Sequence, residues 1–531
     1  MRRNHNMILK SVIVVMLTVG ILCGCAPRPA REAVTSKSDS VFDISILESA
    51  TAPGNDAKHE AKSDDVGLNS EPPAGETTWF QWQSQFKSTD GSVEFNLDFS
   101  KEIPNTAMPV VEVKPHFFTS EDAIQIAQAL FGDQKFYEAA PSLANPKDIF
   151  SKKDIQQAIQ RWGFYTNEQN LLELFPSMTE RSDRKTLYLN LIKEEIANLT
   201  LLLEEAPENG PYSLAEWQFK PEWKYTYSES SIPEGIQLDS NGNQKICVTT
   251  TINDIPYRLN ITTHNTTAYK LNTIFAYPGT VYSPVDIDRD IFRAKLCRTA
   301  EPTAQQIEDI KHKAEKMLNE MGIGTWAVDQ YYIKNTNPDG TPEYVVSIYA
   351  VPVFEGVPAM YRMQLDNLSE NYTASYYMSE AILELSANGD LIYLQLSSPV
   401  DVTNVISENV AIMDLATLMD RVENHLSLSD YHNYGLSGEL LELYEESVGE
   451  KLVCNIELST LNYGLIRVKA SESDACYYYV PGIILSGIAE YCGEKSGTVY
   501  YSSADYISGM KETPLIALNA IDGSIIDLNQ G

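Results

Sequence analysis

Hydrophobic and polar positions begin to alternate clearly at residue 79. Apolar residues at every second position are typical of a half-buried strand, and a pair of turn residues between two such runs predicts a hairpin. Here the turn pair is Asp90-Gly91, and the two runs contain Trp79, Phe80, Trp82 and Phe86, then Val93, Phe95, Leu97 and Phe99. The pattern therefore predicts a hairpin over residues 79–99, and we expect another strand near Val110–Val113.

Other stretches place apolar residues three and four apart, which is the period of a helix. The expected helices cover residues 121–131 before Gly132, a segment opened by Ser151, residues 189–203 before Ala206-Pro207, residues 303–321 before Gly322, and a segment that starts near Asp414. Thr303 followed by Gln306 is a capping-box pair. The stripe over residues 189–203 fits either a coiled-coil seam or a helix face on a sheet. We favour the helix on a sheet, because two heptads are few for a coiled coil.

Runs of short strands follow these helices, with turn residues between them. The turns are expected at Asn241-Gly242, Asn253-Asp254, Glu355-Gly356, Asn388-Gly389 and Asp522-Gly523. Helices set against one side of antiparallel strands make an α+β protein. We expect helices packed on antiparallel sheets in two or three repeated helix-then-meander units. An internal duplication stays open, because turn chemistry alone selects similar strings such as "TINDIPYRL" and "VFEGVPAMY".

The first residues predict export. Arg2, Arg3 and Lys10 precede an apolar run from Ser11 to Gly24 of about 14 residues, which is short for a membrane span and typical of a signal peptide. The end of the run, Leu22-Cys23-Gly24-Cys25, resembles the lipobox of bacterial lipoproteins, with ordinary Ala-x-Ala-like cleavage as the alternative. We expect lipidation of Cys25, since the thiol is the group that receives the diacylglyceryl chains.

Composition divides the chain further. Residues 26–76 are rich in Ala, Ser, Asp, Glu and Pro and almost lack aromatics, so they cannot bury enough apolar surface to offset chain entropy. We expect a signal peptide over residues 1–24, a lipid anchor and disordered acidic tether over 25–76, an N-terminal α+β domain with a helical insert over 77–285, and a C-terminal α+β domain over 286–531.

Charge narrows the range of partners. The chain has 73 acidic and 40 basic residues and a net charge of −33, and loss of the signal peptide makes it about −36. A polyanion is repelled by nucleic-acid phosphates and anionic lipid surfaces. We expect no nucleic-acid partner, contact with the membrane only through the lipid anchor, and a peptide, protein or glycan ligand.

Catalytic motifs are missing from the sequence. There is no G-x-S-x-G, no H-E-x-x-H and no P-loop. The histidines after the tether are His116, His264, His312, His425 and His432, and we interpret them as surface or capping residues. Asp286, Asp288 and Asp290 in "DIDRD" resemble the start of a calcium loop, but Ile291 and Cys297 stand where its glycine and glutamate belong. We therefore expect no catalytic residues, no cofactor and no metal, with these three aspartates as weak metal candidates.

The remaining groups of note are cysteines and tyrosines. Five cysteines beyond Cys25, without any C-x-x-C pair, indicate neither a disulfide scaffold nor a zinc site, although one disulfide among Cys454, Cys476 and Cys492 stays open. The tyrosine clusters "ACYYYV" and "VYYSSADY" fit ligand stacking or, more simply, half-buried strand faces. With 73 acidic residues, the sequence does not exclude a pair of carboxylates that hydrolyses glycan or peptide.

Several of these features together resemble a family of clostridial lipoproteins assigned to a domain of unknown function. They are the lipobox, the acidic tether, the helical insert near residues 119–205, the strand "GDLIYLQLSSP", the helix after it and the closing "LNAIDGSIIDL". The helix-then-hairpin units also resemble PepSY-like and regulatory extracytoplasmic modules. The resemblance implies a Gram-positive location on the outer face of the cytoplasmic membrane and a non-catalytic binding or regulatory module. The alternatives are a cell-wall hydrolase and a structural envelope protein.

Overall fold

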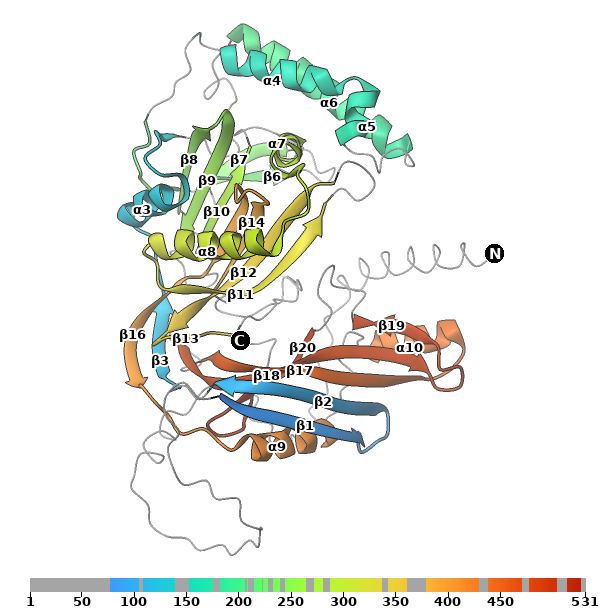
Figure 1. Cartoon of the computed structure of the whole chain (residues 1–531). Helices are drawn as coiled ribbons and strands as arrows, with labels where there is room; N and C mark the ends of the chain where they lie inside the picture. Colours follow the sequence, from blue (N-terminus) through green and yellow to red (C-terminus); the bar gives the residue numbers. More distant parts are fainter. Residues whose placement is uncertain are drawn as a thin grey trace, which may run out of the picture. The chain divides into compact units, whose positions relative to one another are not determined.

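The computed structural model describes residues 77–104, 108–138, 152–174, 182–205, 208, 214–221, 223–227, 233–238, 244–263, 272–279, 287–336, 342–360, 379–428, 438–469, 477–503 and 513–526 (Figure 1). These residues belong to one compact unit, Ser40–Gly531. They form helices packed on two large, almost entirely antiparallel sheets, so the expected α+β class is confirmed. None of the helices in these ranges is both long enough and apolar enough to cross a membrane.

The first sheet joins the two ends of the described chain. Its strands are β1 (Thr77–Lys87), β2 (Val93–Pro104), β3 (Val110–Pro115), β16 (Val400–Ser407), β17 (Leu452–Lys469), β18 (Tyr477–Gly493), β19 (Val499–Ser502), β20 (Thr513–Asn519) and β21 (Ile525–Ile526). The main order is β1-β2-β17-β18-β20-β21, with β3 between β16 and β18. β2 and β17 pair in parallel. Helix α9 (Leu415–Leu428) packs its buried stripe into the core of this sheet, and α10 (Gly438–Val448) packs beside it.

The second sheet comes from the middle of the chain. Its strands are β4 (Tyr137–Glu138), β5 (Lys220–Pro221), β8 (Gln244–Ile252), β9 (Ile255–Thr263), β10 (Thr273–Pro278), β11 (Trp326–Asn335), β12 (Tyr344–Phe354), β13 (Val357–Pro358), β14 (Glu380–Ser386) and β15 (Leu391–Ser397). They run in the order β11-β12-β14-β15-β10-β9-β8-β4. Helices α3 (Ser120–Phe131) and α8 (Ala304–Glu320) share one apolar core with this sheet (Figure 1).

The remaining elements are smaller. Helices α4 (Lys152–Tyr165), α5 (Glu168–Leu174) and α6 (Ser182–Glu205) pack on one another around Trp162, Leu171 and Ile192. The stripe over residues 189–203, which we expected to pack on a sheet, therefore packs on helices instead. Strands β6 (Trp223–Tyr227) and β7 (Pro233–Leu238) form a separate ribbon, and α7 (Ile287–Cys297) precedes α8.

Local sequence signals located most elements well. The hairpin at Asp90-Gly91 and the turns at Asn253-Asp254, Glu355-Gly356 and Asp522-Gly523 are present, with Asn253 and Asp254 both at positive φ. The predicted capping box at Thr303 is also present. The Asn241-Gly242 turn lies outside the described residues. The sequence analysis did not predict α5, α7 or α10.

The expected domain boundary between residues 285 and 286 falls inside the second sheet. β10 lies before this boundary and β15 after it, yet the two strands pair with each other. The first sheet likewise combines strands from residues 77–115 with strands from residues 400–526. A helix followed by strands looks like a unit along the chain, but pairing between distant strands decides which sheet each strand joins. The internal duplication stays a prediction.

A glycine in β18 offers a test of this packing. A Cβ on Gly487 would overlap the backbone carbonyl of Glu457 in β17. We therefore expect Gly487→Ala to lower the free energy of unfolding by about 1–3 kcal/mol, as overpacking does. Gly163 in α4 is the matched control, because a Cβ there meets nothing. Gly163→Ala should raise stability by about 0.5–1 kcal/mol. Urea unfolding measures both, and an unchanged midpoint for Gly487→Ala would contradict the β17–β18 register.

Candidate functional site

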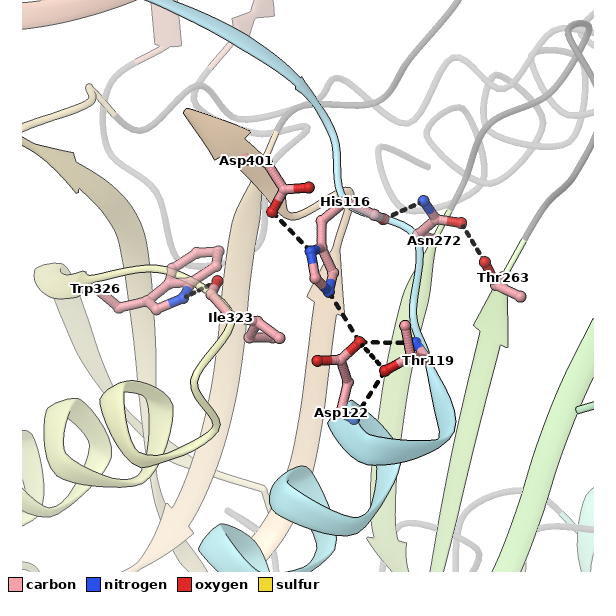
Figure 2. A network of polar contacts seen from close by, with 8 residues as sticks. All are labelled: His116, Thr119, Asp122, Thr263, Asn272, Ile323, Trp326 and Asp401. Atoms are coloured by element: carbon pink, nitrogen blue, oxygen red, sulfur yellow. Dashed lines mark hydrogen bonds and ion pairs between the residues drawn. The ribbon is translucent and has the colours of Figure 1, made fainter. Parts of the chain in front are cut away.

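A histidine lies where the chain passes from the first sheet to the second. His116 directly follows β3, and Asp401 lies in β16, which pairs with β3. His116 Nδ1 is 2.8 Å from Asp401 Oδ1, and His116 Nε2 is 3.3 Å from Asp122 Oδ2 (Figure 2). The His116 side chain is only 16% exposed. A partly buried imidazole thus bridges two carboxylates that are far apart in the sequence.

The second carboxylate also begins helix α3. Asp122 Oδ2 accepts hydrogen bonds from Thr119 N (2.7 Å) and Thr119 Oγ1 (2.8 Å), while Asp122 N donates to Thr119 Oγ1 (3.2 Å). This is a reciprocal capping box. A carboxylate at a helix N-terminus is further stabilised by the helix dipole. His116 therefore fixes the start of α3 as well as β16.

The electrostatics favour a charged imidazole. Burial by itself would lower the pKa of His116, but the hydrogen bond and charge of Asp401 and the charge of Asp122 outweigh it and raise the pKa above 6.5. In the charged form both ring nitrogens carry protons, so each can face an acceptor. The imidazole then has no free lone pair with which to take a proton from a substrate, and the arrangement suits holding elements together.

Backbone contacts strengthen the same junction. His116 N donates to Pro399 O at 2.8 Å, and Asn272 Nδ2 donates to His116 O. Ser398 N donates to Asn272 O at 2.7 Å. Ser398 is in the left-handed region with φ 47°, which is uncommon for a residue other than glycine. We call these contacts of His116, Asp122, Asn272 and Asp401 the crossover network. They join β3, α3 and β16 to the start of β10.

A groove runs along the exposed side of α3. It consists of two open hollows of about 550 and 420 Å³ that share Ile124 and Gln128. The first also involves Glu121, Gln125, Ala129 and Glu320, and the second involves Gly132, Asp133, Gln134, Phe136, Leu214, Ala215 and Trp217. We call the whole surface the α3 groove. The first hollow is lined mostly by polar side chains, whereas the second combines apolar side chains with a few polar groups, which is typical of ligand sites.

The second hollow has an aromatic wall. Phe136 and Trp217 meet edge to face with ring centroids 5.3 Å apart. Ile124 is 38% exposed and Leu214 63% exposed, so apolar surface remains available there. Gln125 Nε2 donates to Glu320 O at 3.1 Å and links α3 to the end of α8 beside the first hollow.

The site residues expected from the sequence lie elsewhere. Cys25 and Asp286 lie outside the described residues, while Asp288 and Asp290 are in the first turn of α7. Within the described ranges no group of three or more His, Cys, Asp or Glu side chains is placed so that it could hold a metal ion. His264 and His432 lie outside these ranges as well. His312 is exposed on α8, and burial lowers the pKa of His425 in α9.

The cysteines and tyrosines mostly serve the core. Cys454 and Cys492 are both free thiols, and Cys476 lies outside the described residues. Tyr477, Tyr479 and Tyr501 are buried, which fits the simpler interpretation of strand faces. The sequence analysis named His116 but did not distinguish it from the other four histidines after the tether. It also did not predict the α3 groove. The only local signal for the groove was Ile124 among the polar residues of the outer face of α3.

Comparison with known proteins assigns this chain to no family. No protein-family model matches it, and no curated protein matches it. A solved structure described as an uncharacterized protein from Eubacterium rectale ATCC 33656 is similar with a TM-score of 0.36 and 10% sequence identity, over 84% of this chain and 93% of that one.

The crossover network predicts a pH dependence of stability. Because the pKa of His116 is raised in the folded state, its contribution is complete below about pH 6.5 and is lost as the pH rises through the folded pKa. At pH 6, His116→Gln should lower the free energy of unfolding by about 1.5–3 kcal/mol, the range for hydrogen bonds to charged groups. The loss should be smaller at pH 9. Denaturation at both pH values measures it, with exposed His312→Gln as the control. Equal losses at both pH values would contradict a charged His116.

Proposed function

We propose that this protein is a non-catalytic binding module, held on the outer face of the cytoplasmic membrane of a Gram-positive bacterium by a lipid on Cys25. The observation that carries the binding role is the α3 groove, an open surface with exposed apolar side chains and an aromatic wall. The lipobox-like Leu22–Cys25 segment and the basic residues before it support the location.

The framework around the groove suits binding. Helix α3 is fixed at its start by the crossover network and at its end by Gly132, whose N–H donates to Gln128 O. Its inner face is buried in the second core through Ala123, Ile126 and Ala127. A surface held in place before the ligand arrives loses little side-chain and backbone freedom on binding. His116, engaged by two carboxylates, supports the helix and does not face a substrate.

The lipid anchor can be tested directly. Two acyl chains should hold the mature protein at the membrane, since each buried methylene contributes about 0.8 kcal/mol. We expect the wild-type protein from cells to enter the detergent phase in a phase partition and to have the mass of a lipidated chain starting at Cys25. Cys25→Ala should stay in the aqueous phase. Cys23→Ala is the matched control and should behave like wild type, and an unlipidated wild-type mass would refute the anchor.

The groove can be tested with Gram-positive cell walls. Full-length detergent-solubilised protein should sediment with isolated sacculi, and Ile124→Glu, which places a charge at the point shared by both hollows, should weaken this binding about tenfold or more, equivalent to about 1.4 kcal/mol. Leu187→Glu on α6 is the control, because Leu187 is an exposed leucine (55%) outside the groove. Wild-type protein that stays in the supernatant, or equal effects of both substitutions, would contradict wall binding through the groove.

A further inference from the structure

We propose that the Phe136–Trp217 hollow of the α3 groove is a subsite for an uncharged, N-acetylated sugar of a glycan strand. This inference rests on the proposed binding function and assigns the class of ligand to one end of the same groove. The hollow of about 420 Å³ lies in the size range of small-molecule sites. It is therefore large enough for a short oligosaccharide.

The first argument is the backbone of Trp217. Its φ is 55°, a left-handed conformation that is an outlier for a bulky residue. The segment is held there by its neighbours, because Ala215 N donates to Phe136 O at 3.0 Å and Glu216 N donates to Glu138 Oε1 at 2.9 Å. Such conformations persist where the surroundings fix them, and they concentrate at ligand sites. Here the strained residue sets its indole against Phe136 in the wall of the hollow.

The second argument is the set of polar groups around this wall. Gln128, Gln134 and Asp133 line the same hollow, and in the described ranges no side-chain hydrogen bond engages any of the three. A glutamine amide offers both a donor and an acceptor, which matches the N–H and C=O of an acetamido group. The carboxylate of Asp133 can accept from sugar hydroxyls. The weakly polarised C–H groups of a sugar ring suit the negative face of an indole.

The charged residues of the α3 groove indicate which class of cell-wall polymer could bind there. Glu121, Asp133 and Glu320 line the groove, and among the described residues no lysine or arginine does so. An anionic polymer would be repelled, as it is by the whole chain of net charge −33. Of the residues that the structure describes around the Phe136–Trp217 hollow, Asp133 alone would offer a carboxylate to a cationic peptide. Two amides and the partly exposed ring of Trp217, backed by the buried Phe136, therefore favour an uncharged sugar at this end.

The test uses full-length detergent-solubilised protein and calorimetric titration with chitotetraose, an uncharged N-acetylated oligosaccharide. We expect binding by wild type, and at least about tenfold weaker binding by Trp217→Gly, since losing an aromatic wall removes about 1.4 kcal/mol or more. Glycine accepts the left-handed φ without strain, although the indole also packs against the second core; far-UV circular dichroism therefore checks that each Trp217 variant is folded before its affinity is compared. Trp217→Phe should keep most of the affinity. Trp79→Gly removes an exposed tryptophan (65%) of β1 outside the groove and is the matched control.

The outcomes separate this inference from the proposed function. If chitotetraose does not bind although Ile124-dependent sedimentation with sacculi persists, the sugar subsite is refuted and the binding module stands. If tetralysine binds in a Trp217-dependent way and chitotetraose does not, the hollow is a cationic-peptide site and the inference is also refuted. Unchanged affinity of folded Trp217→Gly for chitotetraose would overturn the assignment to this hollow.

Discussion

The ion pair of His116 with Asp401 and Asp122 is the interaction on which the arrangement of elements depends. The chain leaves the first sheet at the end of β3 and returns to it at β16, and both passages meet at this histidine. Without these partners the His116 imidazole, whose side chain is mostly buried, would lose hydration without compensation. With them, the end of β3 and the start of α3 are held at one point against β16, which lies far away in the sequence.

This constraint extends to the α3 groove. The inner face of α3 lies in the core of the second sheet, and its outer face forms the groove. The position of that outer face relative to Phe136 and Trp217 thus depends on where the helix starts and on how it packs. A single helix connects the titratable junction at one end with a strained, aromatic hollow at the other. His116 thus contributes to the position of the groove surface through its ion pairs.

Local sequence signals predicted much of the secondary structure. The capping residues Thr303 and Asp414 and the glycines of the turns act within a few residues, so their effects can be inferred from the sequence alone. The start of α7 was missed because "DIDRD" resembles both a calcium loop and an acidic helix start. The parallel pairing of β2 with β17 could not be inferred, since the strands are separated by some 350 residues and pair through backbone groups that every residue carries.

The amino-acid sequence by itself determined the α+β class, the alternating strand faces, the helix ends and the acidic charge, because each follows from the chemistry of neighbouring residues. Tertiary structure decided which strands share a sheet, which of the histidines sits between two carboxylates, and that Trp217 lines a hollow beside α3. These facts depend on contacts between residues as far apart as His116 and Asp401. The energy of such contacts is set by geometry and burial, and neither is encoded in the spacing of residues along the chain.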